Sequence, residues 1–472
     1  MSSLKKKQNV FRRLSLVLAL AATASLSALA GSAAAAGPRP VLVGFEDEPS
    51  FLWSPNRIQN IGAAGEAGAN VIRIIANWAT LQPGRSSYRF NELDDAIWQA
   101  QQRGMRVLLT VWGTPRWASA SHKPSAAPNP TTLGRFCGVL AARYNGSTGR
   151  APVTLFSVWN EPNLAQFLSP QYNKKGRDLA PHLYAGMVRA CYGAIKKANP
   201  SAIVAAGETS PRGTDHPRKG IQQSHSPGRF AQLVAAEKPR IRFDAWAHHP
   251  YGVGFTGSAT VPFRWPNVSV VDLPRLEAHL KTWFHKSTVP LWITEFAYQT
   301  APEAPRALTY SQQASYLQTA FTKAVAVPQV QMFIWFVYRD TPRERWQSGL
   351  VRSDSTPKPA LALWRQAIAP YSVDNPVLRV APNKAPTVAL PLVVLQAHYS
   401  ASDPPIGMSY RVYDASGKLV VGAQATSRLD LTGTGRFTLA AFTPAPGGRY
   451  TVQMTVNDIH GTAVSRTATI AS

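Results

Sequence analysis

Residues 154–161 read TLFSVWNE, an apolar run that ends in two polar groups, Asn160 and Glu161. Residues 290–296, PLWITEF, are also mainly apolar and carry Glu295 near their end. Apolar runs without strict polar alternation are typical of strands that are buried on both faces of a parallel sheet. Both stretches therefore predict core strands with a carboxylate at the carboxyl end.

Working outward from these two runs, six more apolar stretches have the same character, and amphipathic helical stretches separate all of them. We expect the strands at 41–46, 70–77, 106–112, 154–161, 202–208, 243–249, 290–296 and 330–338. We expect the helices near 55–67, 91–103, 131–144, 178–198, 228–237, 272–285, 309–325 and 358–368, with Asn91 and Ser311–Gln312 near two of the helix starts.

Eight strands, each followed by a helix, predict an α/β fold of the (β/α)8 or TIM-barrel class. A doubly wound open sheet is the alternative fold. It is disfavoured because Phe45 and Glu46 follow Gly44, at the point where a glycine-rich phosphate loop would stand.

The chain is expected to have four parts. Residues 1–36 resemble a secretory signal peptide, with basic residues up to Arg13, an apolar run over 14–30 and small residues before the cut; an uncleaved membrane anchor is the competing interpretation. The barrel is expected over 37–372 and a proline-rich linker over 373–386. Alternating runs and turn residues over 387–472 predict a small immunoglobulin-like β-sandwich that either braces the barrel or binds glycan.

The chain carries a formal net charge of +25. This charge could favour an acidic polymer or an anionic cell envelope, but an arginine-rich compositional habit is the preferred explanation. No nucleic-acid-binding motif accompanies it, so we expect no nucleic-acid partner and, in the mature chain, no membrane span.

The two cysteines, Cys137 and Cys191, lack the paired spacing of a cysteine-based zinc site. They fall on the helices expected after strands three and four, which are neighbours in a barrel. We therefore expect a disulfide in an exported protein.

Active sites of such barrels lie at the carboxyl ends of the strands. The polar and aromatic residues expected there are Arg73, Asn77, Trp112, Asn160, Glu161, Glu208, His248, His249, Tyr251, Glu295 and Trp335. Glu161 and Glu295 lie on nearly opposite strands and could flank a bond over the barrel mouth. Cleavage of a glycosidic bond needs such a pair, because one carboxyl protonates the leaving oxygen while the other attacks the anomeric carbon.

These motifs carry a family resemblance over residues 41–368. The segment 158–163, VWNEPN, resembles the strand-four signature of glycoside hydrolase clan A, the 4/7 superfamily, and 292–296, WITEF, resembles its strand-seven nucleophile segment. His249-Pro250-Tyr251 is similar to the His-x-Tyr of strand six, and Trp335 to the tryptophan of strand eight. Families thirty-nine and five are the nearest, although Trp112 stands where family five usually has a histidine, which leaves the substrate open.

The resemblance implies that Glu161 is the acid/base and Glu295 the nucleophile. It also implies that Arg73 and Tyr251 contact the nucleophile, that Asn160 binds the sugar 2-hydroxyl, and that Trp335 lies beneath the sugar with a cis bond to Phe336. The expected substrate-binding set is Arg73, Trp112, Asn160, Glu208, His249, Tyr251 and Trp335. Glu208 could bind sugar hydroxyls or could instead form a salt bridge to Arg212, and the sequence favours neither role.

The sequence thus predicts a secreted retaining glycoside hydrolase that acts on a glycoside, oligosaccharide or polysaccharide, with carboxyl carbons roughly 5–5.5 Å apart. A transglycosidase that remodels surface polysaccharide and a non-catalytic carbohydrate-binding barrel are the alternatives. We expect no cofactor and no metal. His248 and His249 do not indicate a metal site, because adjacent residues on a strand point to opposite faces, so one of the two should lie in the core. Of Trp53, Trp78, Trp112 and Trp117, one or two should contact the ligand; the sugar, the linkage and the oligomeric state stay open.

Overall fold

The computed structural model describes residues 41–371 except 102, 104, 149, 218–221, 343 and 345. Beyond them it describes residues 377–379, 387–389, 406–427, 436–438, 449–457 and 463–471. The expected signal segment lies outside the described residues, as does most of the expected linker.

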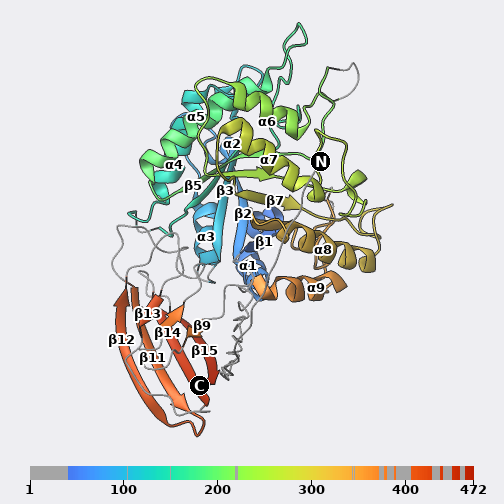
Figure 1. Cartoon of the computed structure of the whole chain (residues 1–472). Coiled ribbons are helices and arrows are strands. Elements are labelled where there is room, and N and C mark those ends of the chain that lie inside the picture. The colour runs from blue at the N-terminus through green and yellow to red at the C-terminus, as the bar shows by residue number, and fades with distance from the viewer. Residues whose placement is uncertain are drawn as a thin grey trace, which may run out of the picture. The chain divides into compact units, whose positions relative to one another are not determined.

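Eight parallel strands close into a barrel in the order β1 to β8, with β8 paired to β1 (Figure 1). The strands are β1 (Leu42–Glu46), β2 (Val71–Asn77), β3 (Arg106–Trp112), β4 (Leu155–Val158), β5 (Ile203–Thr209), β6 (Ala245–His248), β7 (Leu291–Phe296) and β8 (Val330–Phe336). This confirms the (β/α)8 prediction. Expected and observed strand bounds differ most in β4 and β6, where the polar ends leave the strand.

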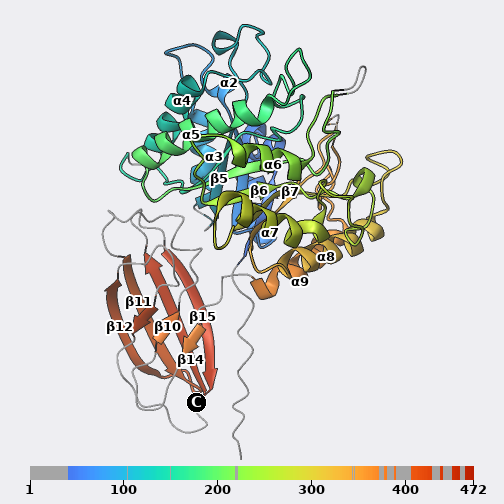
Figure 2. The same cartoon turned by 45° about the horizontal axis from the view of Figure 1, so that its top comes forward.

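The helices α3 to α9 surround the strands, as the turned view in Figure 2 shows. The helices are α1 (Arg57–Glu66), α2 (Trp78–Leu81), α3 (Asn91–Gln101), α4 (Pro130–Arg143), α5 (Ala180–Ala198), α6 (Pro227–Ala236), α7 (Leu273–Phe284), α8 (Tyr310–Val325) and α9 (Pro359–Ile368). Short turns of π- or 3₁₀-helix occupy Pro49–Trp53, Arg116–Ala118, Val253–Phe255, Val270–Asp272 and Ala369–Tyr371. The short helix α2 and the π-helical turn were not expected from the sequence.

The start of α8 agrees with the prediction, because Ser311 and Gln312 lie in its first turn. Thr309 caps the helix: its hydroxyl accepts a hydrogen bond from the backbone N–H of Gln312, and the backbone N–H of Thr309 donates to Oε1 of Gln312. This reciprocal pair is a capping box, which satisfies two backbone N–H groups that a helix start leaves unpaired.

Side chains of the strands alternate between two apolar layers. Val71, Leu108, Trp292, Met332 and Ile334 belong to the layer inside the barrel. Their chain neighbours, such as Ile72, Leu109, Ile293 and Phe333, join the larger layer that packs against the helices. Because strand side chains alternate in direction, every second residue toward the carboxyl end points into the barrel mouth.

Beyond the barrel, the chain forms two antiparallel sheets, with strand orders β13-β10-β9 and β12-β11-β14-β15. Their strands are β9 (Val377–Arg379), β10 (Thr387–Ala389), β11 (Ile406–Asp414), β12 (Leu419–Ser427), β13 (Arg436–Thr438), β14 (Arg449–Asn457) and β15 (Ala463–Ala471). They are consistent with the expected small sandwich. Strand β9 falls inside the expected linker, so this segment contributes to a sheet.

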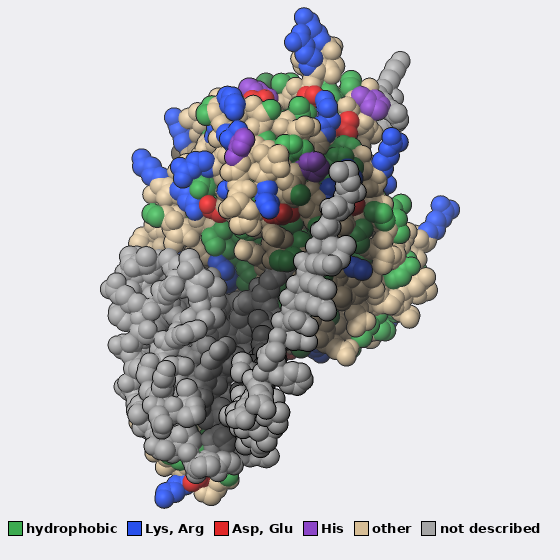
Figure 3. All heavy atoms as spheres, in the orientation of Figure 1, with side chains coloured by type: hydrophobic (Ala, Val, Ile, Leu, Met, Phe, Trp, Pro, Cys, Tyr) green, Lys and Arg blue, Asp and Glu red, His purple; other side chains and the backbone are tan. Residues whose placement is uncertain are grey.

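Lys and Arg side chains are scattered over the face of the barrel in Figure 3 and form no single patch on it. In the part of the chain that the structure describes, no helix has both the length and the apolar character needed to cross a membrane.

A disulfide joins α4 to α5 through Cys137 and Cys191, whose Cα atoms lie 5.3 Å apart. Small residues bring these helices together: a Cβ on Gly134 would lie 3.1 Å from the Cβ of Ala190. Such a contact is tighter than most contacts of a real Cβ, so glycine at this position favours the close approach of the two helices. The sequence therefore sets the helix distance that the disulfide requires.

The disulfide should be intact in protein that is purified without reductant, and it should contribute to stability. We expect no reactive thiol in the denatured, unreduced chain. Replacing both cysteines, Cys137→Ala with Cys191→Ala, should lower the free energy of unfolding by about 2–4 kcal/mol, because the bond closes a loop of 54 residues. Denaturant titration with and without dithiothreitol measures this loss.

The reductant should destabilise the wild type and leave the double variant unaffected. Two reactive thiols in the unreduced protein, or equal reductant sensitivity in both proteins, would contradict the bond.

Candidate active site

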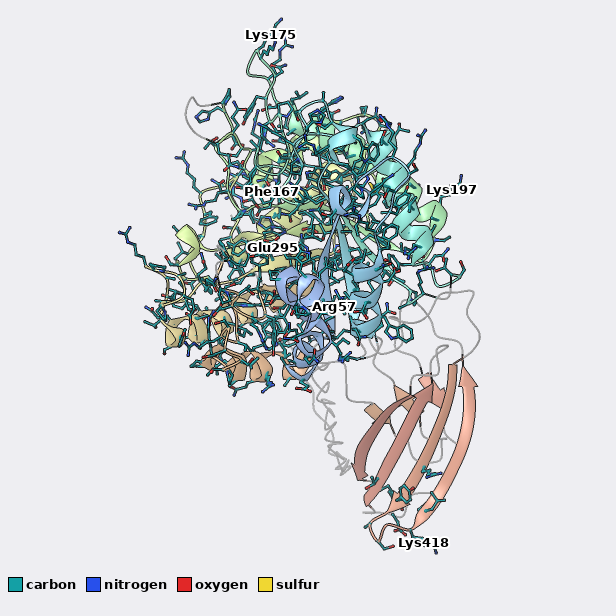
Figure 4. All side chains as sticks on the ribbon, turned by 180° about the vertical axis from the view of Figure 1, so that it is seen from behind. Arg57, Phe167, Lys175, Lys197, Glu295 and Lys418 are labelled. Atoms are coloured by element: carbon teal, nitrogen blue, oxygen red, sulfur yellow. A yellow bond between two sulfur atoms is a disulfide. The ribbon has the colours of Figure 1, made fainter. Side chains whose placement is uncertain are left out.

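A cavity of about 760 Å³ lies at the carboxyl ends of the strands. Four carboxylates line it, Glu46, Glu48, Glu161 and Glu295, together with the rings of Trp53, Trp112, Phe167, Tyr251, Phe336 and Trp346 and several amides, among them Asn77, Asn160, Gln166, Gln222 and Gln299. Figure 4 shows Glu295 near the centre of the barrel, with Phe167 close to it in this view. Aromatic walls with a few convergent polar groups are typical of a site for a small organic ligand.

Glu161 and Glu295 reach this cavity through local departures from regular strand geometry. Trp159 and Glu161, just after β4, have positive φ values of 71° and 38°. In β7 the register shifts between Ile293 and Phe296, so Thr294 and Glu295 both face inward. Such irregularities are common beside active sites because they redirect a side chain. One oxygen of Glu161 and one of Glu295 thereby lie within 4.8 Å of each other.

Arg73 lies fully buried beneath the cavity and holds its floor together. Its guanidinium donates to Glu295 Oε1 at 2.7 Å, Asn160 Oδ1 at 2.8 Å and Glu208 Oε2 at 3.2 Å, and it also pairs with Glu46. Burial alone would lower the pKa of Arg73, but the carboxylates outweigh burial and raise it well above its ordinary value. Arg73 is therefore a permanent cation beside the nucleophile candidate.

His249 is a second buried cation. Its Nδ1 lies 3.1 Å from Glu161 Oε1, and its Nε2 lies 2.9 Å from Glu208 Oε2. Burial opposes protonation, but Glu295, Glu161 and Glu208 outweigh it and raise the pKa of His249 to about 9. Both ring nitrogens therefore carry hydrogen at neutral pH and donate to Glu161 and Glu208.

The two carboxylates have different surroundings. Glu295 accepts hydrogen bonds from Arg73 and from the Tyr251 hydroxyl at 2.9 Å, and both donors stabilise its anionic form. Burial raises the pKa of Glu161, and the charge of Glu295 adds to this, although His249 acts against it. The raised pKa of Glu161 suits a proton donor, whereas the two donors that hold Glu295 orient its carboxylate for attack.

Glu161, His249 and Glu295 also approach one another closely enough to hold a metal ion. Both ring nitrogens of His249 are engaged with Glu161 and Glu208, so a metal ion would have to replace one of these hydrogen bonds.

The structure corrects the expectation for Glu208. The side chain is completely buried and does not line the cavity, so it is not placed to bind sugar hydroxyls, and its ion pairs are with Arg73 and His249 rather than with Arg212. Burial alone would raise its pKa, but Arg73 and His249 lower it to about 2. Gly207, at φ 98°, and Glu208, at φ 49°, turn this carboxylate inward beneath the floor.

The expectation for Trp335 was also wrong. Its indole is fully buried on the helix side of β8, where Nε1 donates to the Ser348 carbonyl at 2.9 Å. Met332 and Ile334 face the barrel interior, so the next inward residue is Phe336, which lines the cavity. The non-proline cis bond likewise follows Phe336, not Trp335.

The remaining expected residues fall into three groups. Trp112, Asn160 and Tyr251 line the cavity, and Arg73 and His249 lie beneath it without lining it. His248 faces away and pairs with Thr209 and Val268, as expected for a core histidine. Of the four tryptophans considered, Trp53 and Trp112 line the cavity, whereas Trp78 and Trp117 do not.

Sequence reasoning missed Glu46, Glu48, Phe167, Phe336 and Trp346, all of which line the cavity. A period-two count along β1 and β8 would have found Glu46 and Phe336, because both follow inward-facing positions. The three others lie outside the barrel strands, where no periodicity marks them. Two long segments follow strands β5 and β6. The segment 209–227 contributes Ser210 and Gln222 to the cavity lining, and the described part of 252–267 contributes no lining residue.

Comparison with solved structures supports the fold. A GH5_18 structure from Streptomyces cattleya in complex with GlcNAc aligns with a TM-score of 0.52 and 17% identity, covering 74% of this chain and 84% of that chain. A GH39 β-xylosidase from Caulobacter crescentus aligns with a TM-score of 0.50 and 17% identity, covering 80% and 83%. At such identities the likeness concerns the fold alone. No curated protein matches the chain.

The family model of Cellulase (glycosyl hydrolase family 5) matches residues 38–336, which include the whole strand region from β1 to β8. Trp112 therefore stands in place of the expected strand-three histidine within this family. The chain belongs to glycosyl hydrolase family 5, and with it to glycoside hydrolase clan A.

Proposed function

We propose that the protein is an exported retaining glycoside hydrolase in which Glu161 is the acid/base and Glu295 the nucleophile. The observation that carries this proposal is the approach of their carboxylate oxygens within 4.8 Å. Retaining enzymes keep their two carboxyls about 5–5.5 Å apart, whereas inverting enzymes leave about 6.5–9.5 Å for a water molecule. The short separation supports direct attack by Glu295.

In the first step, Glu295 attacks the anomeric carbon as Glu161 gives its proton to the leaving oxygen. The glycosidic bond breaks, and an ester to Glu295 forms. Because His249 donates to Oε1 of Glu161, the proton of Glu161 belongs on Oε2. Arg73 and Tyr251 hold the other carboxylate for attack.

In the second step, the negative charge on Glu295 is gone, so the electrostatic cost of ionising Glu161 falls. Glu161 can then take a proton from water as the water attacks the anomeric carbon and releases Glu295. The buried cation Arg73 stabilises the departing carboxylate. The order of the two roles of Glu161 thus follows from the charge of its neighbour.

Export is part of the proposal. It is supported by the basic, apolar and small-residue order of residues 1–36. The disulfide adds to this support, because such bonds persist mainly in oxidising compartments.

Azide rescue should separate the roles of the two glutamates. Glu295→Ala should abolish turnover of all aryl β-glycosides, and added azide should restore only the α-glycosyl azide. Glu161→Ala should lower kcat/KM by about 10²–10⁴-fold for poor leaving groups and little for dinitrophenyl glycosides, with azide releasing the β-azide. Product stereochemistry by NMR gives the readout, and Glu92→Ala, an exposed change on α3, is the control.

Exchanged azide products would reverse the two assignments. Full activity in either variant would reject the mechanism.

The pH profile should identify the general acid. Glu161 must be protonated for the first step, so kcat/KM should fall as pH rises through its pKa, which burial raises above that of ordinary glutamate. With a dinitrophenyl leaving group, which needs no proton, this alkaline limb should disappear. Profiles for the same sugar with a poor and a good leaving group provide the matched comparison.

The Glu161→Gln variant should also lack the limb. An identical limb for both leaving groups would assign it to another residue.

A further inference from the structure

A second hollow lies in the helix layer, between the neighbouring helices α6 and α7 (Figure 2). Its volume is about 410 Å³, and it shares no lining residue with the cavity at the strand ends. We call it the α6/α7 groove. Its lining includes Asp215, Gly228, Arg229, Gln232, Trp265 and Trp283.

Two indole rings, those of Trp265 and Trp283, form the aromatic part of the groove. Both side chains are half-buried, and their ring centroids lie 6.4 Å apart. The ring of His279 stacks on Trp265 at 4.5 Å and on Trp283 at 4.9 Å, and the guanidinium carbon of Arg275 lies 4.6 Å from the centre of the Trp265 ring. Arg275, His279 and Trp283 are spaced four residues apart and so follow one face of α7. These contacts hold both indoles in place before a ligand binds.

Glycine at position 228 allows Trp265 to pack against the start of α6. A Cβ on Gly228 would lie 2.9 Å from the Trp265 ring and 2.9 Å from the Cβ of Pro266. Real Cβ atoms essentially never show contacts this short, so a larger residue would displace the indole. The segment 252–267, which adds no residue to the active-site cavity, thus places an indole in the α6/α7 groove.

Three polar side chains surround the indoles. Asp215 is oriented by Ser226, whose backbone N–H and hydroxyl donate to its two carboxylate oxygens at 2.7 Å each. A carboxylate offers about four acceptor sites, so Asp215 can accept further hydrogen bonds. Arg229 donates from Nη2 to Asp178 at 2.8 Å, whereas its buried Nε has no hydrogen-bond partner among the described residues. Gln232 is exposed and offers both a donor and an acceptor.

This combination of groups suits a sugar ring. Half-buried indoles beside a hollow keep apolar surface in water, and a ligand that covers them recovers free energy. A buried donor without a partner, such as Nε of Arg229, likewise costs free energy until an acceptor satisfies it. The C–H face of a pyranose meets the first need and its hydroxyls meet the second. The lining holds one carboxylate and one guanidinium, so it favours an uncharged glycan.

We propose that the α6/α7 groove is a second carbohydrate-binding site, which holds a sugar unit of an uncharged polysaccharide outside the active site. The two indoles stack on the sugar, and the three polar side chains bind its hydroxyls. The segment 209–227 borders both sites, through Ser210 and Gln222 in the cavity and Asp215 in the groove. A polymer bound in the groove is therefore kept at a high local concentration near the active site. This role goes beyond the proposed function and does not depend on the two catalytic glutamates.

Calorimetric titration of the full chain tests the groove directly. The probes are mixed-linkage β-glucan, glucomannan and xylan, and the Glu295→Ala background keeps them intact. At least one of the three should bind. Trp283→Ala should raise its Kd about tenfold, the value of one aromatic contact, and Gln232→Ala about two- to tenfold, the value of one neutral hydrogen bond. Trp98→Ala, which removes a tryptophan that is 40% exposed on α3, is the matched control and should leave Kd unchanged.

Two further variants guard against a folding defect, because Trp283 also packs against the core. Trp283→Phe keeps an aromatic ring and should restore most of the affinity. Gln232 is exposed, so Gln232→Ala tests the groove without disturbing the core. Polygalacturonate is the charge control: the basic surface should attract it equally in wild type and Trp283→Ala, and about 1 M salt, with a Debye length of about 3 Å, should abolish this attraction.

Kinetics of the active enzyme separate the groove from the active site. Trp283→Ala should lower kcat/KM for the bound polymer by about three- to tenfold, because the local concentration of the polymer falls. An aryl glycoside is too small to occupy both sites, so its kcat/KM should stay unchanged. A merely structural role of Trp283 would lower both values together.

The outcomes for the two sites are distinct. Equal polymer affinity in wild type, Trp283→Ala and Gln232→Ala would overturn the proposal, as would no binding of any of the three uncharged polymers. Binding that depends on the groove but is never followed by cleavage would refute the hydrolase function alone. Cleavage that needs Glu161 and Glu295 but is insensitive to the groove variants would refute the second site alone.

Discussion

A single buried cation, Arg73, sets the arrangement of the barrel mouth. An unpaired guanidinium in a fully buried position would cost several kcal/mol, so the fold must bring acceptors to it from other strands. It does so with Glu46 of β1, Glu208 of β5, Glu295 of β7 and Asn160 just after β4. Glu46, Asn160 and Glu295 line the cavity, whereas Glu208 lies beneath it and pairs with Arg73 and His249. Losing the cation would leave several buried carboxylates uncompensated.

The same network prepares the charges for the chemistry. Arg73 and His249 are positive, while Glu208, whose pKa is lowered to about 2, is negative and shared between them. Glu208 is therefore a positioning residue that orients both cations from below. Glu161 receives one hydrogen bond from His249 in a buried place that favours its protonated form. The surroundings that suit Glu161 to the acid/base role and Glu295 to the nucleophile role are thus present before a substrate binds.

The sequence predicted the fold and most of the site because both follow from periodicity and strand order. Eight apolar runs with intervening helices predict the barrel, and the strand ends then predict Arg73, Asn160, Glu161, Tyr251 and Glu295. The two residues that were placed wrongly have different causes. Glu208 was read as a ligand contact, but a register shift and two positive φ values bury it; Trp335 was chosen by residue type, whereas the alternation in β8 brings Phe336 inward. Register shifts and left-handed residues leave little trace in a single sequence.

Net charge and local charge must be considered separately in this protein. The chain carries a net charge of +25, yet the described lining of its cavity holds carboxylates and no basic side chain. Surface charges are screened within about 8–10 Å in physiological salt, so they act on approach and on attachment rather than on the bound sugar. Groups that touch the ligand in a partly dry cavity interact far more strongly. The residues at the carboxyl ends of the strands, rather than the net charge of the chain, therefore act most strongly on a ligand in the cavity.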